Sequence, residues 1–181
     1  MTAIAGLIHE GRVLLGSDSA ASGGWNIEIR RDAKVFRSGR YVMGFTTSFR
    51  MGQILRWSLE PPQPPGNGQL ERFMCTTWVD AVREALKAGG WAKRDAEQET
   101  GGEFLVGVSG RLFTVYADYQ VGEVAAEYAA VGSGEQLALG AFAATEGMRL
   151  SPKRRVSLAL SAAERHISSV RGPFHLLWEG R

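Results

Sequence analysis

The sequence predicts an α+β fold, in which antiparallel strands and helices occupy separate stretches of the chain. Short apolar segments come in pairs joined by tight turns, which is typical of β-hairpins, and helical patterns also come in pairs. The predicted order is strands, two helices, strands, two helices and a last strand. This order lacks the regular strand–helix alternation that builds a parallel sheet.

Length and composition predict one globular domain spanning residues 1–181. Of these residues, 44% are hydrophobic and 22% are charged, as in ordinary globular proteins. The formal charge of +2 does not predict a nucleic-acid partner. No apolar segment approaches the ~18 residues of a membrane span, and the short apolar N-terminus lacks the basic start of a signal peptide. We therefore expect a cytoplasmic protein that does not associate with a membrane.

Metal-binding patterns are missing from the sequence. Cys75 is the single cysteine, which excludes an internal disulfide and any multi-cysteine metal site. The three histidines, His9, His166 and His175, lie too far apart for a local zinc motif. We expect a function that needs neither metal nor cofactor.

Two hairpins are predicted in the first part of the chain. Segments 2–8 and 12–18 form the first around a turn centred on Glu10, and segments 34–37 and 41–46 form the second. The apolar character of these strands is nearly continuous, which indicates a sheet covered on both faces.

Four helices and four further strands follow from capping residues and apolar spacing. The helices are expected to begin near Ser48, Leu70, Ser133 and Ser151 and to end near residues 60, 89, 146 and 166. The strands are expected at 103–109, 112–116, near 127–131 and 173–178, with the polar segment 90–102 as a surface loop.

The first hairpin brings Thr2 toward two charged residues. With a turn centred on Glu10, the numbers of facing residues sum to twenty, so Thr2 is expected opposite Asp18. Lys34 begins the next strand and can reach the same place. A small second residue generally allows the initiator methionine to be removed, which would give Thr2 a free α-amino group with a pKa of about 7.7–8.

An N-terminal threonine combines a nucleophile and a base in one residue. The hydroxyl attacks a carbonyl carbon while the neutral α-amine takes its proton. A nearby lysine cation favours loss of the hydroxyl proton, and an aspartate fixes that cation. Simpler interpretations remain open: Thr2 as an ordinary strand residue, Asp18–Lys34 as a structural ion pair, and Ser133 as a helix cap.

Five segments together resemble one known family. The chain is similar over essentially its whole length to the catalytic β subunits of proteasomes and to the bacterial HslV peptidases, which are N-terminal-nucleophile (Ntn) hydrolases. The segments that carry this resemblance are Thr2-Ala3-Ile4-Ala5-Gly6, Gly16-Ser17-Asp18, Asp32-Ala33-Lys34-Val35, Val42-Met43-Gly44-Phe45 and Gly132-Ser133-Gly134.

The resemblance implies a fold and a role for individual residues. The fold is a four-layer αββα sandwich of two antiparallel sheets between helix pairs. The implied catalytic residues are Thr2 as nucleophile, Asp18 and Lys34 as its charged partners, Gly44 as the oxyanion-hole amide, and Ser133 and Ser169 near the terminal amine. The implied substrate-binding residues are Ser22, Val42 and Thr46. His166 stands where the family has an aspartate, so we expect an extra pH dependence of activity from its titration.

The resemblance implies threonine-type hydrolysis of peptide bonds in a polypeptide or peptide substrate. The protein would act in a homo-oligomeric ring or stacked assembly, with an unfolding ATPase as a possible partner. Two alternatives stay open: a catalytically silent scaffold subunit of such an assembly, and an Ntn amidase that acts on small amides.

Overall fold

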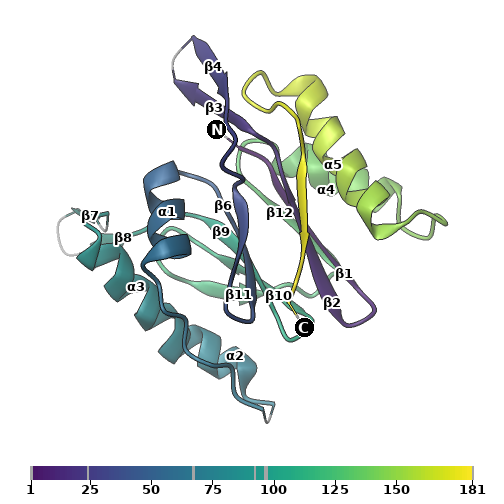
Figure 1. Ribbon diagram of the computed structural model, residues 1–181. Helices are drawn as coiled ribbons and strands as arrows, with labels where there is room; N and C mark the ends of the chain where they lie inside the picture. The colour runs from purple at the N-terminus through teal and green to yellow at the C-terminus, as the bar shows by residue number, and fades with distance from the viewer. Residues whose placement is uncertain (1, 24, 67, 92, 96–97, 181) are drawn as a thin grey trace.

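Two antiparallel sheets lie face to face between two layers of helices (Figure 1). The computed structural model describes residues 2–23, 25–66, 68–91, 93–95 and 98–180. The predicted four-layer αββα sandwich is therefore confirmed, with helices on both outer faces.

The first sheet has four strands and carries two long helices on its outer face. Its strand order is β12 (Tyr128–Val131), β1 (Ile4–His9), β2 (Arg12–Ser17) and β13 (His175–Trp178). The covering helices are α4 (Glu135–Ala144) and α5 (Pro152–His166). Helix α5 begins as predicted at Ser151, whose side chain accepts a hydrogen bond from the Arg154 amide.

The second sheet has five strands and is covered by the remaining helices. Its strand order is β11 (Val121–Glu123), β10 (Arg111–Val115), β9 (Phe104–Val108), β6 (Tyr41–Phe45) and β5 (Val35–Ser38). The covering helices are α1 (Phe49–Trp57), capped by Ser48, and a long helix made of α2 (Leu70–Phe73), a π-helical turn (Met74–Trp78) and α3 (Val79–Ala88).

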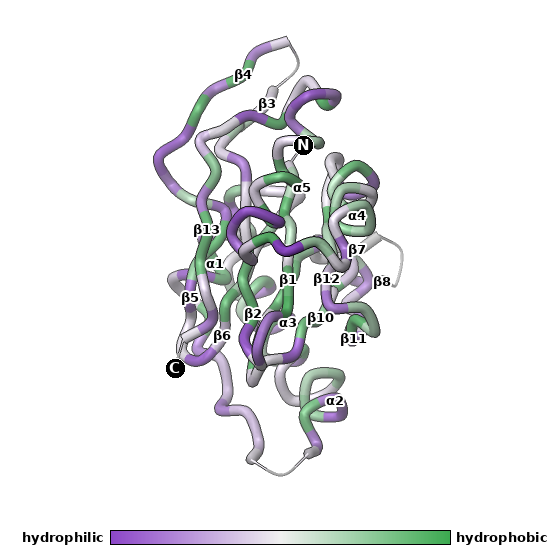
Figure 2. Tube along the Cα trace, turned by 90° about the vertical axis from the view of Figure 1, so that its right-hand side faces the viewer, coloured by the Kyte–Doolittle hydropathy of each residue, from purple (hydrophilic) through white to green (hydrophobic). Residues whose placement is uncertain are grey.

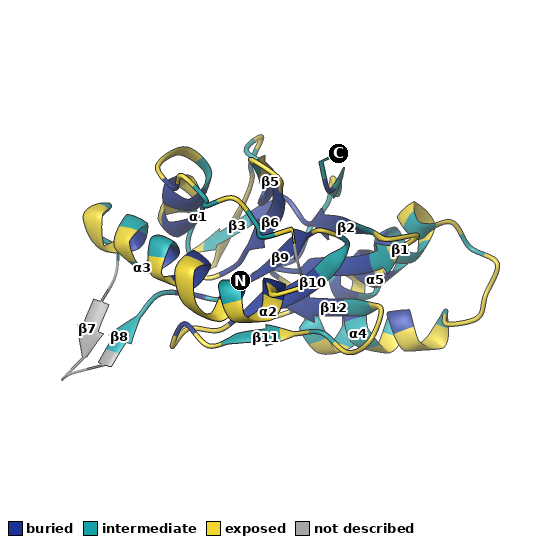
Figure 3. Cartoon of the chain, turned by 90° about the horizontal axis from the view of Figure 1, so that it is seen from below, coloured by how far each residue is buried: buried dark blue, intermediate teal, exposed yellow. Residues whose placement is uncertain are grey.

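Side-chain alternation along the strands fills three hydrophobic layers. Ile4 and Leu15 face the space between the sheets, whereas Ala5 and Leu14 face α4 and α5. Figure 2 shows β1 as hydrophobic along its centre, and Figure 3 shows buried strands between helices whose outer faces are exposed. Continuous apolar strands are thus explained by burial on both faces.

The register of the first hairpin differs from the prediction by one residue. Ile4 faces Ser17, so facing numbers sum to 21 and Asp18 lies beside Ala3 instead of Thr2. The reason is the turn, which has two residues with positive φ, Glu10 at 48° and Gly11 at 68°. This is the backbone of a two-residue hairpin turn, so the centre falls between these residues.

Three short pairings lie outside the predicted strands. A two-stranded sheet of β3 (Ala20–Gly23) and β4 (Asn26–Ile29) projects from the body beside the N-terminus (Figure 1). Strands β7 (Lys93–Asp95) and β8 (Gln98–Thr100) pair within the expected surface loop, part of which lies outside the described residues. Strand β11, which is three residues long, pairs with β10. Segments this short carry too little periodicity to be recognised from the sequence.

None of the helices in the described segments is long and apolar enough to cross a membrane.

Candidate active site

A buried ion pair lies at the end of the first hairpin. The Lys34 ammonium donates to Asp18 Oδ1 at 2.7 Å, and the two side chains are 1% and 0% exposed. Asp18 directly follows β2 of the first sheet, and Lys34 directly precedes β5 of the second sheet. The ion pair therefore links the two sheets. The predicted meeting of these residues is therefore found.

The Asp18 carboxylate is held by backbone amides as well. Oδ1 also accepts from the Ala3 amide at 3.1 Å, and Oδ2 accepts from the Ala20 amide at 3.0 Å. A buried carboxylate needs such partners because leaving it unpaired costs several kcal/mol. Since Ala3 follows Thr2 directly, Asp18 fixes both the ammonium and the chain next to Thr2.

Burial lowers the pKa of Lys34. Loss of hydration disfavours the ammonium, and the attraction of Asp18 offsets only part of this effect. The Lys34 ammonium also lies 5.7 Å from the centre of the Phe49 ring.

Thr2 is held in place by the segment 132–134. Ser133 Oγ accepts from the Thr2 nitrogen at 3.1 Å and lies 3.2 Å from the Thr2 carbonyl oxygen, to which its hydroxyl donates. Gly132 has φ +93°, and a Cβ there would lie 2.4 Å from that same oxygen, so only glycine fits. The cap of α4 is Gly134 and makes no side-chain capping bond, so Ser133 serves Thr2 and not the helix.

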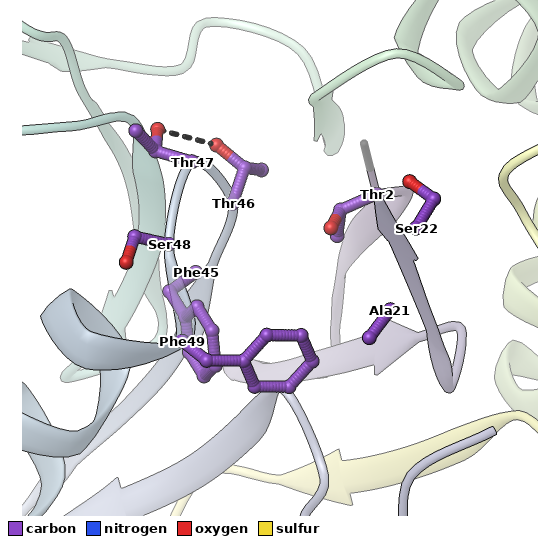
Figure 4. Close-up of a pocket in the computed structure, with 8 residues that line it drawn as sticks. All are labelled: Thr2, Ala21, Ser22, Phe45, Thr46, Thr47, Ser48 and Phe49. Atoms are coloured by element: carbon purple, nitrogen blue, oxygen red, sulfur yellow. Dashed lines mark hydrogen bonds between the residues drawn. The ribbon is translucent and has the colours of Figure 1, made fainter. Parts of the chain in front are cut away.

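Thr2 lines a cavity of about 100 Å³. Figure 4 shows Thr2 and Ser22 on one side, the loop from Thr46 to Ser48 on the other, and two aromatic rings below. The predicted substrate-binding residues Ser22 and Thr46 are therefore both at this cavity. Its complete lining is Thr2, Ala21, Ser22, Phe45, Thr46, Thr47, Ser48 and Phe49.

Two predicted residues lie elsewhere. Val42 is fully buried in the core between the sheets, so it does not fit the predicted place in a substrate groove. Gly44 lies inside β6 paired with Leu105, and a Cβ there would meet Ile4 at 2.6 Å between the sheets. The Thr46 amide donates to Glu103 O, just before β9. Amides two residues apart along a strand point to the same side, so the Gly44 amide also faces β9. This orientation does not fit the predicted donor role.

Thr47 is the residue that the sequence prediction missed. Successive amides along a strand point to opposite sides. The Phe45 amide donates to Lys34 O on the β5 side, and the Thr46 amide donates to Glu103 O on the β9 side. The Thr47 amide therefore points to the β5 side again. There β5 has ended, and no acceptor within the described residues bonds this amide. An unpaired N–H at the cavity is the feature that an oxyanion hole requires.

The Thr47 backbone is strained and locked. Its φ is +58°, and the Ser48 amide donates to Thr46 O at 2.6 Å, which makes Thr47 the centre of a γ-turn. Thr47 Oγ1 accepts from the Glu103 amide at 3.1 Å. Strain of this kind is common where a backbone group is held for function. The sequence did not indicate this conformation, because positive φ is usually predicted from glycine or asparagine and position 47 is a threonine.

The two residues near the end of α5 differ in placement. Ser169 is buried, and its hydroxyl has no hydrogen-bond partner among the described residues. His166 is exposed and lines a groove between α4 and α5 with Ala141 and Thr145. His166 is thus part of the outer surface and does not line the Thr2 cavity. This position does not fit the predicted influence of His166 on the α-amine of Thr2.

Metal-binding clusters are not found within the described segments: no group of three or more His, Cys, Asp or Glu could hold an ion.

The arrangement of layers matches that of solved structures over nearly the whole chain. BPH from Thiobacillus denitrificans, solved in complex with epoxomicin, superposes with a TM-score of 0.81 at 22% identity and covers 97% of each chain. The chain has the proteasome-type Ntn-hydrolase fold.

Two further structures share the proteasome-type fold. HslV from Trypanosoma brucei gives a TM-score of 0.71 at 18% identity, covering 98% of this chain and 99% of that one. Anbu, an ancestral β-subunit from Yersinia bercovieri, gives 0.66 at 16% identity, covering 98% and 81%. Neither a protein-family model nor a curated protein matches the sequence.

Proposed function

We propose that this protein is a threonine-type peptidase whose nucleophile is Thr2, freed by removal of Met1. The observation that carries the proposal is the position of Thr2: it lines a cavity, its backbone is held by Ser133, and the next residue, Ala3, donates its amide to the Asp18 carboxylate that pairs with Lys34. Asp18 offsets the cost of burying the Lys34 charge, and an ammonium held this close to the start of the chain favours the ionised form of the Thr2 hydroxyl.

The proposed reaction has two steps. The Thr2 hydroxyl oxygen bonds to the carbonyl carbon of a peptide bond, and its proton passes to the free α-amine of Thr2. When the C–N bond breaks, that proton goes to the leaving amine, and an acyl ester remains on Thr2. Water then attacks the ester, which releases the acid and restores the hydroxyl.

Lys34 and Asp18 act on the nucleophile through charge. The Lys34 ammonium stabilises negative charge that develops on the hydroxyl oxygen and favours the neutral form of the nearby amine. Asp18 holds this ammonium at 2.7 Å and keeps it in place in a dry environment where the field is strong.

The Thr47 amide stabilises the tetrahedral intermediate. We assign this role to Thr47 instead of Gly44. Two features support the assignment: the Thr47 N–H is unpaired within the described residues, and the γ-turn holds it at the cavity. A single preorganised donor of this kind contributes about 3 kcal/mol to catalysis.

Assembly into a homo-oligomer is part of the proposal. The projecting β3–β4 hairpin carries exposed large apolar side chains, with Trp25 fully exposed and Ile27 and Ile29 half exposed. Large exposed apolar groups on one element mark contact surfaces. Sedimentation of the wild type and of Trp25→Ser tests this part, since the variant is expected to shift toward the monomer.

The N-terminus and the nucleophile are tested together. Intact-mass analysis of the purified protein should show a chain that begins at Thr2, and peptide hydrolysis should be lost in Thr2→Ala with an unchanged circular dichroism spectrum. An electrophile such as epoxomicin should add its mass to the Thr2 peptide of the wild type alone. Retained Met1 with no hydrolysis would favour the silent scaffold subunit, and hydrolysis of small amides alone would favour the Ntn amidase.

A further inference from the structure

Glu103 lies where two parts of the Thr2 site meet. It directly precedes β9 and continues the pairing of β9 with β6 by one residue. One part of the site is the loop 46–47 after β6, and the other is the segment 132–134, which holds Thr2. Glu103 contacts both parts, the first through its backbone and the second through its side chain.

The backbone of Glu103 fixes the loop 46–47. The Glu103 carbonyl oxygen accepts from the Thr46 amide at 3.0 Å and from the Thr46 hydroxyl at 2.7 Å. The Glu103 amide donates to Thr47 Oγ1 at 3.1 Å, and the hydroxyl oxygens of Thr46 and Thr47 lie 3.2 Å apart (Figure 4). Gly102 allows this close approach, because a Cβ there would lie 3.1 Å from Thr47 Cβ. The γ-turn at Thr47 is therefore supported by Glu103.

The side chain of Glu103 reaches the other part of the site. Its carboxylate accepts a hydrogen bond from the Gly132 amide. Gly132 also packs against the loop, since a Cβ there would lie 3.0 Å from the methyl group of Thr46, as well as against the Thr2 carbonyl oxygen. The carboxylate thus connects the loop 46–47 to the segment that holds Thr2.

Ion pairing does not account for this carboxylate. Burial and the nearby Glu135 carboxylate raise the pKa of Glu103, whereas the Gly132 amide favours its ionised form. Both glutamates line a hollow of about 280 Å³ beside β10 and β12, and neither forms an ion pair with a lysine, arginine or histidine among the described residues. Two carboxylates without a cation repel each other, so the favourable contact of the Glu103 side chain is its hydrogen bond to Gly132.

We infer that Glu103 is a positioning residue, which sets the distance between the Thr2 hydroxyl and the Thr47 amide. This inference rests on the proposed function. The nucleophile and the oxyanion donor must reach the same carbonyl group, and a displacement of about 1 Å can cost ~100-fold in rate. Thr2 precedes a strand of the first sheet and Thr47 follows a strand of the second, so their separation depends on contacts that bridge the sheets. Glu103 supplies such a contact.

The test separates the reach of the side chain from its charge, with a fluorogenic tripeptide amide as substrate. Glu103→Gln keeps an oxygen that can accept from Gly132, Glu103→Asp keeps the charge but is one methylene too short, and Glu103→Ala keeps neither. We expect kcat to fall about 10-fold in Glu103→Ala and Glu103→Asp, as for the loss of one hydrogen bond to a charged group. In Glu103→Gln, kcat should stay within about 3-fold of the wild type. KM should change less than kcat, because an oxyanion contact strengthens in the transition state.

Glu123→Ala is the matched control. Glu123 lines the same hollow, but its carboxylate contacts Arg111, so kcat of this variant should equal that of the wild type. Thr47→Val tests the connection itself, because it removes the acceptor of the Glu103 amide. The loss in kcat of Thr47→Val combined with Glu103→Ala should be smaller than the product of the two single losses, since both changes break the same connection.

The outcomes distinguish this inference from the proposed function. If the wild type hydrolyses the peptide, then a wild-type kcat in Glu103→Ala, an equal loss in Glu103→Gln, or the full product of losses in the double variant would overturn this inference alone. If urea titration shows that Glu103→Ala does not fold, a higher kcat in Glu103→Asp than in Glu103→Gln would do the same. A wild type that does not cleave the peptide, or a Thr2→Ala variant that cleaves it equally, would overturn the proposed function and this inference together.

Discussion

The Lys34 ammonium and the Asp18 carboxylate form a 2.7 Å contact with almost no access to water. The two residues flank strands of different sheets, Asp18 after β2 and Lys34 before β5, so their contact exists only when the sandwich is assembled. Removing one partner would leave a buried charge without compensation, which costs about 3–5 kcal/mol. The pair therefore couples the stability of the fold to the charge beside Thr2.

Lys34→Ala should lower kcat for peptide hydrolysis at least ~100-fold with a smaller change in KM, because the ammonium acts mainly on the transition state. Lys34→Arg should restore little, since a planar guanidinium does not fit the place of an ammonium. Steady-state kinetics, with folding checked by urea denaturation, measure both. Near-normal turnover in folded Lys34→Ala would reduce Asp18–Lys34 to a structural pair.

The pH profile should have an alkaline limb set by Lys34. Because burial lowers the pKa of Lys34, its ammonium loses its proton at a lower pH than an ordinary lysine, whose pKa is 10.5, and hydrolysis should fall there. The effect on stability has the opposite sign. Between the lowered pKa and 10.5 the unfolded state binds more protons, so this group's contribution to the free energy of unfolding rises with pH. An alkaline limb at or above pH 10.5, or none, would contradict the role of Lys34.

His166→Asn should leave the pH profile of kcat/KM superimposable on that of the wild type. The structure puts His166 at the end of α5, among the residues that line the outer groove and away from the Thr2 cavity. Profiles recorded between about pH 5.5 and 8.5 decide this. A difference confined to about pH 6–7.5 would restore the sequence-based expectation.

Ser133→Ala should lower kcat about 10-fold. It removes the two hydrogen bonds to Thr2, at 3.1 and 3.2 Å, and each such bond is worth ~0.5–1.5 kcal/mol. Ser151→Ala is the matched control, because Ser151 caps α5 and its loss should cost ~1 kcal/mol of stability without changing kcat. Equal kinetics in the two variants would assign Ser133 a purely structural role.

Glu179→Gln should destabilise the fold by about 2 kcal/mol. The Glu179 carboxylate is buried and accepts from the Val13 amide at 3.2 Å and the Gly110 amide at 3.1 Å, which ties the C-terminal segment to two hairpins. Hydrogen bonds to a charged group contribute ~1.5–3 kcal/mol each. The exposed Glu146→Gln should stay within ~0.5 kcal/mol of the wild type in the same urea titration. Equal midpoints for the two variants would contradict this role.

Local chemistry determined much of this protein from its sequence. Ser48 and Ser151 begin their helices because a hydroxyl satisfies amides within the same turn. Apolar spacing located most strands and helices, and the pairings β3–β4 and β7–β8 were missed because strands of three or four residues are too short to show a periodic pattern. The meeting of Asp18 with Lys34 was also predicted, since Asp18 lies at the end of the first hairpin and Lys34 begins the next strand, which can reach the same place.

The tertiary structure alone decided where backbone groups point. A one-residue difference in the hairpin turn places Asp18 beside Ala3 instead of Thr2. The register between β6 and β9 directs the Gly44 amide toward β9, whereas the Thr47 amide has no hydrogen-bond acceptor within the described residues. Side-chain identity carries no information about such amides, because every residue except proline has one. Their direction depends on the register between strands far apart in the sequence, which only the packing of the two sheets fixes.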